Sequence, residues 1–139
     1  ELFIRASSGS YTKAAGEDDQ SIALGITGYK GRVHVHFGAP VSQGLEDSKL
    51  LAAEMDRQIL SGYRLFPVHY LAYAMWTERD PELTVPSAAE LFPAAELSAA
   101  KSEWQRRLAN CPSEQQPYLI LQYANPVRNH YRVRAGLAL

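Results

Sequence analysis

The stretch from residue 28 to residue 41 places the strongest constraint on how this chain folds. Over residues 32–37 apolar side chains alternate with charged or titratable ones, which is the two-residue period of a β-strand. The apolar members are Val33, Val35 and Phe37, and the polar members are Arg32, His34 and His36. Full burial of an apolar side chain contributes about 1.5–3 kcal/mol, so this apolar face is able to anchor a core. We therefore expect a strand at residues 32–37, with helices and loops elsewhere that pack on or near it.

The composition limits the classes of protein to which this chain can belong. With 139 residues, 46% of them hydrophobic, the chain is ordinary globular material for about one domain. Its 14 basic and 15 acidic residues give no overall attraction to nucleic acid. No run approaches the roughly 18 apolar residues of a transmembrane helix, and the single Cys111 excludes an intrachain disulfide, as in a reducing compartment. We expect a cytoplasmic protein forming one unit, with a strand-bearing segment at 1–46 and a mostly helical segment at 47–139.

Helical patterns dominate the rest of the chain. A helix is predicted at about 47–61, because Leu51, Met55 and Ile59 recur at one-turn spacing, and Gly62 is expected to end it in the left-handed conformation. Before the strand, residues 1–6 are interpreted as the tail of a helix, with an edge strand as the alternative. Three acidic residues at 17–19 favour the start of a short helix that ends by residue 25 or 28.

Further helices are predicted from residue 67 onward. Pro67 fits the first turn of a buried helix that reaches residue 76, and Ser87 with Glu90 matches a capping box. Pro93 begins a longer helix, which residues 110–112 end. Its predicted stripe consists of Leu97, Ala100, Trp104 and Leu108. Residues 118–123 fit a strand or a helix; we favour a helix stopped at residues 125–126, since the residue before a proline is pushed out of the helical region.

The sequence contains only weak patterns for a metal site or for a catalytic nucleophile. His34 and His36 point to one side of the expected strand, a spacing that zinc sites use, but a third ligand from His69, His130 or Asp47 depends on the fold. A polar strand face is the simpler interpretation. Cys111 has no local nucleophile signature beside Pro112, and a packed or exposed thiol is the simpler interpretation. We expect neither a metal nor a cofactor.

The cations nearest the glycine-rich turns are candidate ligands for a phosphate or a carboxylate. They are Lys13, Lys30 and Arg32. The glycines at 25–31 do not form a Walker loop, because they lack its spacing and lead into a strand. Solvated side chains are the alternative interpretation. The basic residues of the C-terminal tail, at 128, 132 and 134, would add about 1 kcal/mol each at an anionic bilayer, with an ordinary solvated terminus as the alternative.

Short blocks along most of the chain resemble the bacterial glycerol-3-phosphate and 1-acylglycerol-3-phosphate acyltransferases, a glycerolipid acyltransferase family. They are residues 9–13 (GSYTK), 19–22 (DQSI), 25–35 (GITGYKGRVHV), 37–41 (FGAPV), 56–59 (DRQI), 63–67 (YRLFP) and 70–72 (YLA), with a weaker one at 123–127 (YANPV). In that family a strand followed by a Gly-x-Pro turn lies downstream of the catalytic residues. The resemblance implies the helix-rich C-terminal portion of an α/β sheet domain.

The catalytic signature of that family is absent from this chain. It is a histidine followed five residues later by an aspartate, and the residues five after the four histidines here are Ala39, Val41, Ala74 and Ala135. The resemblance therefore implies a noncatalytic portion of an enzyme that transfers a fatty acyl group from a thioester carrier to a glycerol-phosphate hydroxyl. Both substrates would bind through a preceding N-terminal part, with peripheral contact to the inner face of a membrane and no nucleic acid.

A lone strand cannot satisfy its backbone N–H and C=O groups. Partners must come from the rest of the enzyme, from another chain, or from segments interpreted here as helices. A noncatalytic interaction module with the same C-terminal architecture, which binds a partner through its strand edge or apolar helices, is the alternative hypothesis.

Overall fold

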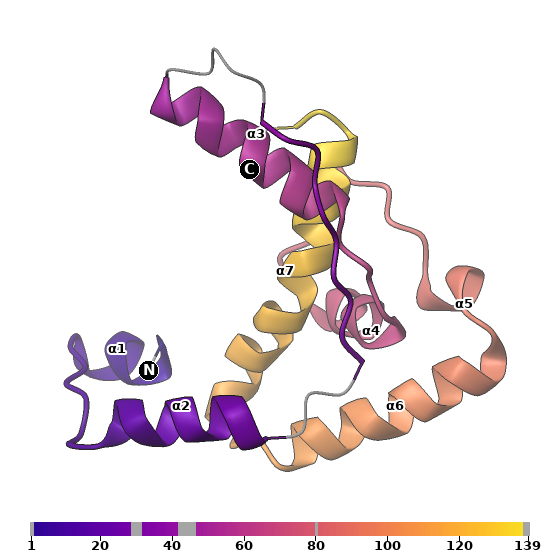
Figure 1. The fold of residues 1–139 in the computed structure, drawn as a ribbon. Coiled ribbons are helices and arrows are strands. Elements are labelled where there is room, and N and C mark those ends of the chain that lie inside the picture. Colours follow the sequence, from indigo (N-terminus) through magenta and orange to yellow (C-terminus); the bar gives the residue numbers. More distant parts are fainter. Residues whose placement is uncertain (1, 29–31, 42–46, 80, 138–139) are drawn as a thin grey trace. The chain divides into compact units, whose positions relative to one another are not determined.

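The structure is a computed structural model that describes residues 2–28, 32–41, 47–79 and 81–137, and it is built from helices joined by loops (Figure 1). The chain divides into two compact units, residues 1–35 and residues 36–139. The first holds α1 (Leu2–Ser8) and α2 (Glu17–Thr27). The buried core belongs to the second unit.

The helices of the N-terminal unit start and stop where the sequence indicates. Residues 2–8 are helical, so the interpretation of the first residues as helix is confirmed and the edge strand is wrong. α2 carries its three acidic residues in the first turn, where the helix dipole favours them, and its cap is Gly28. No residue of α2 is buried. This unit therefore has little apolar packing of its own.

The second unit contains five α-helices and one 3₁₀ turn within its described residues. They are α3 (Ser48–Ser61), α4 (Pro67–Met75), α5 (Ala88–Leu91), α6 (Ala94–Ala109), η1 (Ser113–Gln115) and α7 (Gln116–Arg134). α4 packs against α5, α6 and α7, and α3 packs against α7. Figure 1 shows α7 as the long helix of this unit, with α3 near its C-terminal end.

The core forms where α4, α6 and α7 meet. Its buried members are Tyr70, Ala72, Tyr73, Trp104, Ala124 and Val127. Ala72, Ala124 and Val127 are completely inaccessible to solvent. The small residues allow α4 and α7 to approach closely, while the aromatic rings fill the space around them.

Local signals fix several helix starts as the sequence predicts. The Asp47 side chain accepts a hydrogen bond from the backbone N–H of Lys49 at 2.7 Å, which caps α3. The Ser87 N–H and hydroxyl both donate to Glu90 Oε2, at 2.7 and 2.6 Å, so the expected capping box is present at α5. α6 begins directly after Pro93, and its Leu97 and Trp104 are buried as the predicted stripe requires.

The prediction of an α/β fold with a strand at residues 32–37 is wrong. Residues 33–41 are extended, but the part of the chain that the structure describes contains no strand. A strand is defined by its ladder of hydrogen bonds to a neighbour, and among the described residues every regular element is helical. The alternating sequence favours an extended backbone without supplying anything for it to pair with.

Two predicted helix ends also differ. Gly62 caps α3 at φ −80°, in the right-handed region, so no left-handed terminus is formed there. The helix expected to stop at residues 125–126 continues through Pro126 to Arg134. Ala124 and Val127, on either side of this proline, are both completely buried. Their packing against α4 outweighs the hydrogen bond that proline removes from the helix.

Candidate functional site

The strongest candidate for a functional surface is the extended run at residues 33–41, which we call the docking segment. Val33, Val35 and Phe37, its apolar row, are 73%, 66% and 89% exposed. The backbone of residues 33–41 forms no hydrogen bond with any described residue. Val33 and Val35 belong to the N-terminal unit and Phe37 to the C-terminal unit. Exposed large apolar side chains of this kind are suited to binding.

The part of the docking segment in the C-terminal unit lies along α3. The ring of His36 is in close contact with Gly62, and a Cβ at that position would overlap it. Gly38 is similarly close to the side chain of Gln58. These two glycine contacts place His36 and Gly38 against the helix, while Phe37 between them remains exposed.

Next to these contacts the segment and α3 border an open groove of about 540 Å³. Its apolar lining comes from Ala39, Pro40, Val41, Leu50 and Ala53, and its polar lining from Glu54, Arg57 and Gln58. Such a mixed, open surface suits contact with a macromolecule better than enclosure of a small ligand.

The charged groups of this groove are paired with one another. Arg57 donates to both oxygens of Glu54, at 2.7 and 2.6 Å, and Gln58 adds a 2.7 Å bond to the same carboxylate. These hydrogen bonds lower the pKa of Glu54 to about 2. Arg57 therefore carries a largely neutralised charge within the groove.

The predicted phosphate ligands are spread along the N-terminal unit. Lys13 lies between α1 and α2 and donates to Asp18 at 2.6 Å, so its charge is offset by a carboxylate. Arg32 is exposed at the start of the extended run, next to Val33. Lys30 falls outside the described residues. The role of these three cations in binding phosphate stays a prediction.

The four histidines do not gather into a metal site among the described residues. No group of three or more His, Cys, Asp or Glu side chains there could hold a metal ion. His34 is exposed, whereas His130 is buried with its Nδ1 2.7 Å from the carbonyl oxygen of Leu60. His130 thereby joins α7 to the last turn of α3. Cys111 is a partly buried free thiol.

Sequence reasoning missed a polar and aromatic cluster between α4, α6 and α7. Arg107 donates to the Tyr123 hydroxyl at 2.6 Å, and its guanidinium carbon lies 5.6 Å from the centre of that ring. The Tyr123 ring packs against Trp104 on one side, at 5.2 Å, and near His69 on the other, at 6.1 Å. The signal that would have revealed His69 is its place three residues after Phe66, the spacing of a capping box.

Comparison with protein-family models, with curated proteins and with solved structures finds no match to this chain. Among the described residues, no helix combines the length and the apolar character that crossing a bilayer requires.

Proposed function

We propose that this chain is the C-terminal, noncatalytic portion of a glycerolipid acyltransferase that works at the cytoplasmic face of a membrane. In the reaction, a glycerol-phosphate hydroxyl oxygen attacks the carbonyl carbon of an acyl thioester. A C–O ester bond forms, the C–S bond breaks, and the carrier leaves as a thiol. The catalytic part would take up the hydroxyl proton, and this chain supports that part.

The observation that carries the proposal is the exposure of the docking segment. The blocks that resemble the acyltransferases include residues 25–35 and 37–41, and the apolar row of Val33, Val35 and Phe37 falls within them. The catalytic part is the surface proposed to cover this row. Burial of each of these side chains would contribute about 1.5–3 kcal/mol, which is enough in sum to hold two parts of an enzyme together.

The candidate phosphate ligands fit the same proposal. Arg32 directly precedes the apolar row, so a catalytic part docked on the row would lie beside this guanidinium. A cation at that place would attract the phosphate of the acceptor lipid. Of the other two candidates, Lys13 is paired with Asp18 and Lys30 lies outside the described residues.

The first test is the reading frame upstream of residue 1. We expect it to encode a histidine followed five residues later by an aspartate, within one domain length. The chain of residues 1–139 alone should transfer no acyl group from an acyl thioester to glycerol 3-phosphate or to its 1-acyl derivative. An upstream sequence without the motif, or clear turnover by the isolated chain, would refute the proposal.

The second test is mutation of the docking segment in the full-length polypeptide. Val35→Asp with Phe37→Asp should lower acyl transfer at least tenfold, because two charges cannot be buried against the catalytic part without a large cost. The matched control is Leu91→Asp, which places one charge on α5 at a residue that is 42% exposed. Full activity of the double variant would show that the row does not dock on the catalytic part.

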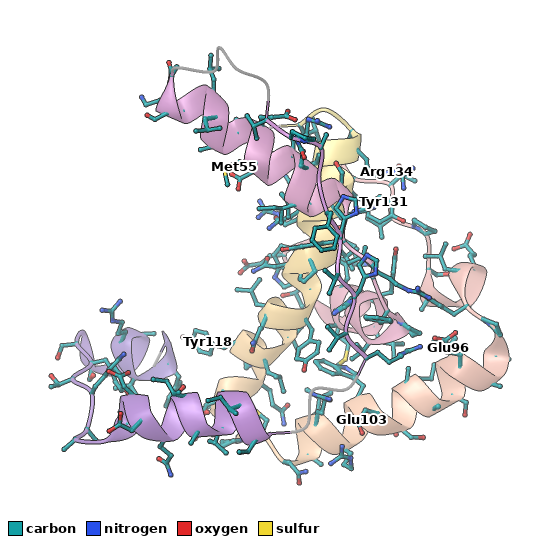
Figure 2. All side chains as sticks on the ribbon, in the orientation of Figure 1. Met55, Glu96, Glu103, Tyr118, Tyr131 and Arg134 are labelled. Carbon is teal, nitrogen blue, oxygen red and sulfur yellow. The ribbon has the colours of Figure 1, made fainter. Side chains whose placement is uncertain are left out.

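A second candidate function is a noncatalytic interaction module. α3 favours it, because its Leu50, Met55 and Ile59 are 58%, 47% and 51% exposed. Met55 is labelled on this helix in Figure 2. A start codon shortly before residue 1 and a stable 15.5 kDa product in cells would favour this module over the enzyme portion.

A further inference from the structure

The first turn of α4 is closed by a histidine side chain. The backbone N–H of Phe66 donates to Nδ1 of His69 at 2.9 Å, and the N–H of His69 donates back to the carbonyl oxygen of Phe66 at 2.9 Å. In a capping box the side chain that accepts from the N-cap N–H is usually a glutamate or glutamine three residues later, and here that acceptor is a histidine. Nδ1 can accept this bond only while it carries no proton.

The surroundings of His69 favour its neutral form. The ring lies 5.9 Å from the ring of Phe66 and 6.1 Å from that of Tyr123. Burial in this partly enclosed position lowers the pKa of His69 below its ordinary value of 6.5. The N-terminus of a helix also repels a cation, so the position of His69 within α4 acts in the same direction.

The pKa of His69 is lowered by burial, without an offsetting charge from the described residues. From α7 it is faced by the Tyr123 phenol, whose hydroxyl oxygen accepts from Arg107 of α6. α6 carries two carboxylates, Glu96 and Glu103, and Glu103 accepts from Arg107 at 2.8 Å. On the other side, the guanidinium of Arg64 lies 6.0 Å from the Phe66 ring.

The remaining helix that packs on α4 adds no partner for an imidazolium. α5 carries one carboxylate, Glu90, which is occupied by the N–H and the hydroxyl of Ser87. The other histidine of the packed helices, His130, is bound to the Leu60 carbonyl at the far end of α7.

We infer that His69 is an acid-sensitive latch, which holds the first turn of α4 closed when it is neutral and releases it when protonated. Protonation removes the acceptor for the Phe66 N–H and places a cation at the start of α4. The contact between α4 and Tyr123 of α7 then loosens. The latch lies outside the docking segment and does not depend on the proposed function.

The direction of the pH response follows from linkage. The unfolded or opened state binds a proton at the ordinary pKa of 6.5, whereas the closed state binds it at a lower pKa. The closed turn therefore has its full stability above pH 6.5 and loses stability as the pH falls below that value. Each unit of difference between the two pKa values changes the opening equilibrium by about tenfold.

The test compares amide hydrogen exchange of residues 66–70 at pH 7.5 and pH 5.5 in the full chain, after correction for intrinsic exchange rates. We expect opening to increase severalfold on acidification in the wild type. His69→Gln should abolish the increase, because glutamine accepts the same bond and does not titrate. The matched control His34→Gln changes an exposed histidine and should leave the increase unchanged.

Side-chain NMR supplies a second measurement on the unaltered protein. His69 should hold its proton on Nε2 at neutral pH, and its pKa should lie below the ordinary value of 6.5. An acid response that survives in His69→Gln would overturn the inference. So would a His69 imidazole with a pKa at or above 6.5, even if the glutamine variant does not fold.

Discussion

At the scale of single residues, the stability of the C-terminal unit depends on a few positions without solvent access. Val127 makes α7 contact the other core helices and is 0% exposed. The side chains around Val127 are closely packed, so they cannot move far enough to fill a cavity that a smaller residue would leave. Residues of similar chemistry elsewhere, such as Val33 at 73% exposure, contribute nothing to this packing.

Val127→Ala should therefore destabilise the fold by about 2 kcal/mol, from the two lost methyl groups and the cavity that remains. The measurement is urea unfolding followed by tryptophan fluorescence, with a lower midpoint and an unchanged slope. Val33→Ala makes the same chemical change on the surface and should stay within about 0.5 kcal/mol of the wild type. Equal effects at both positions would contradict the described core.

At the scale of elements, α7 shows how packing decides where a helix ends. Pro126 has no N–H, so the carbonyl of Gln122 lacks its helical partner within α7. The helix nevertheless continues for two more turns, because the buried residues before and after the proline lie on one face. Tertiary contacts thus override a local signal that normally stops a helix.

Replacing this proline tests that account. Pro126→Ala should stabilise the protein by about 1–3 kcal/mol, since alanine restores the hydrogen bond and fits a helix better. The thermal midpoint is the measurement. Pro117→Ala, in the first turn of the same helix, should change it little because no partner for that N–H exists there. A loss of stability in Pro126→Ala would mean that the proline itself is needed for packing.

The contrast between local signals and tertiary contacts also explains which features the sequence could predict and which it could not. Starts of helices were predictable at Asp47, Pro67 and Ser87, because these signals depend on residues within the first turn of each helix. The strand at 32–37 was not, because alternation at Val33, Val35 and Phe37 reports a preference for extended backbone and says nothing about a neighbouring strand. The role of His69 needed the structure, since an imidazole cap has the spacing of a capping box without its usual residue.

At the scale of the whole molecule, the two units differ in how much apolar surface they bury. The core residues all fall within residues 36–139, while α2 contains no buried side chain. Cooperative unfolding follows the buried core, so the C-terminal unit is the one expected to set the stability of the chain. The docking segment joins the two units in sequence.

A chain truncated to residues 36–139 should consequently unfold at nearly the same urea midpoint as the full chain. Circular dichroism and tryptophan fluorescence should give coincident transitions, as expected for a single cooperative unit. Both tryptophans lie in this portion, so the fluorescence signal is retained. A midpoint that falls sharply on truncation would show that residues 1–35 contribute to the core.

One contact joins a buried residue of this core to a residue that is exposed to solvent. The indole N–H of Trp104 donates to the sulfur of Met75 at 3.1 Å, and Met75 is 47% exposed although Trp104 is only 3% exposed. A peroxide that adds oxygen to this thioether would turn a weak acceptor into a strong, polar one at the edge of the core. Oxidation of Met75 at the surface would then directly change the surroundings of the buried Trp104 indole.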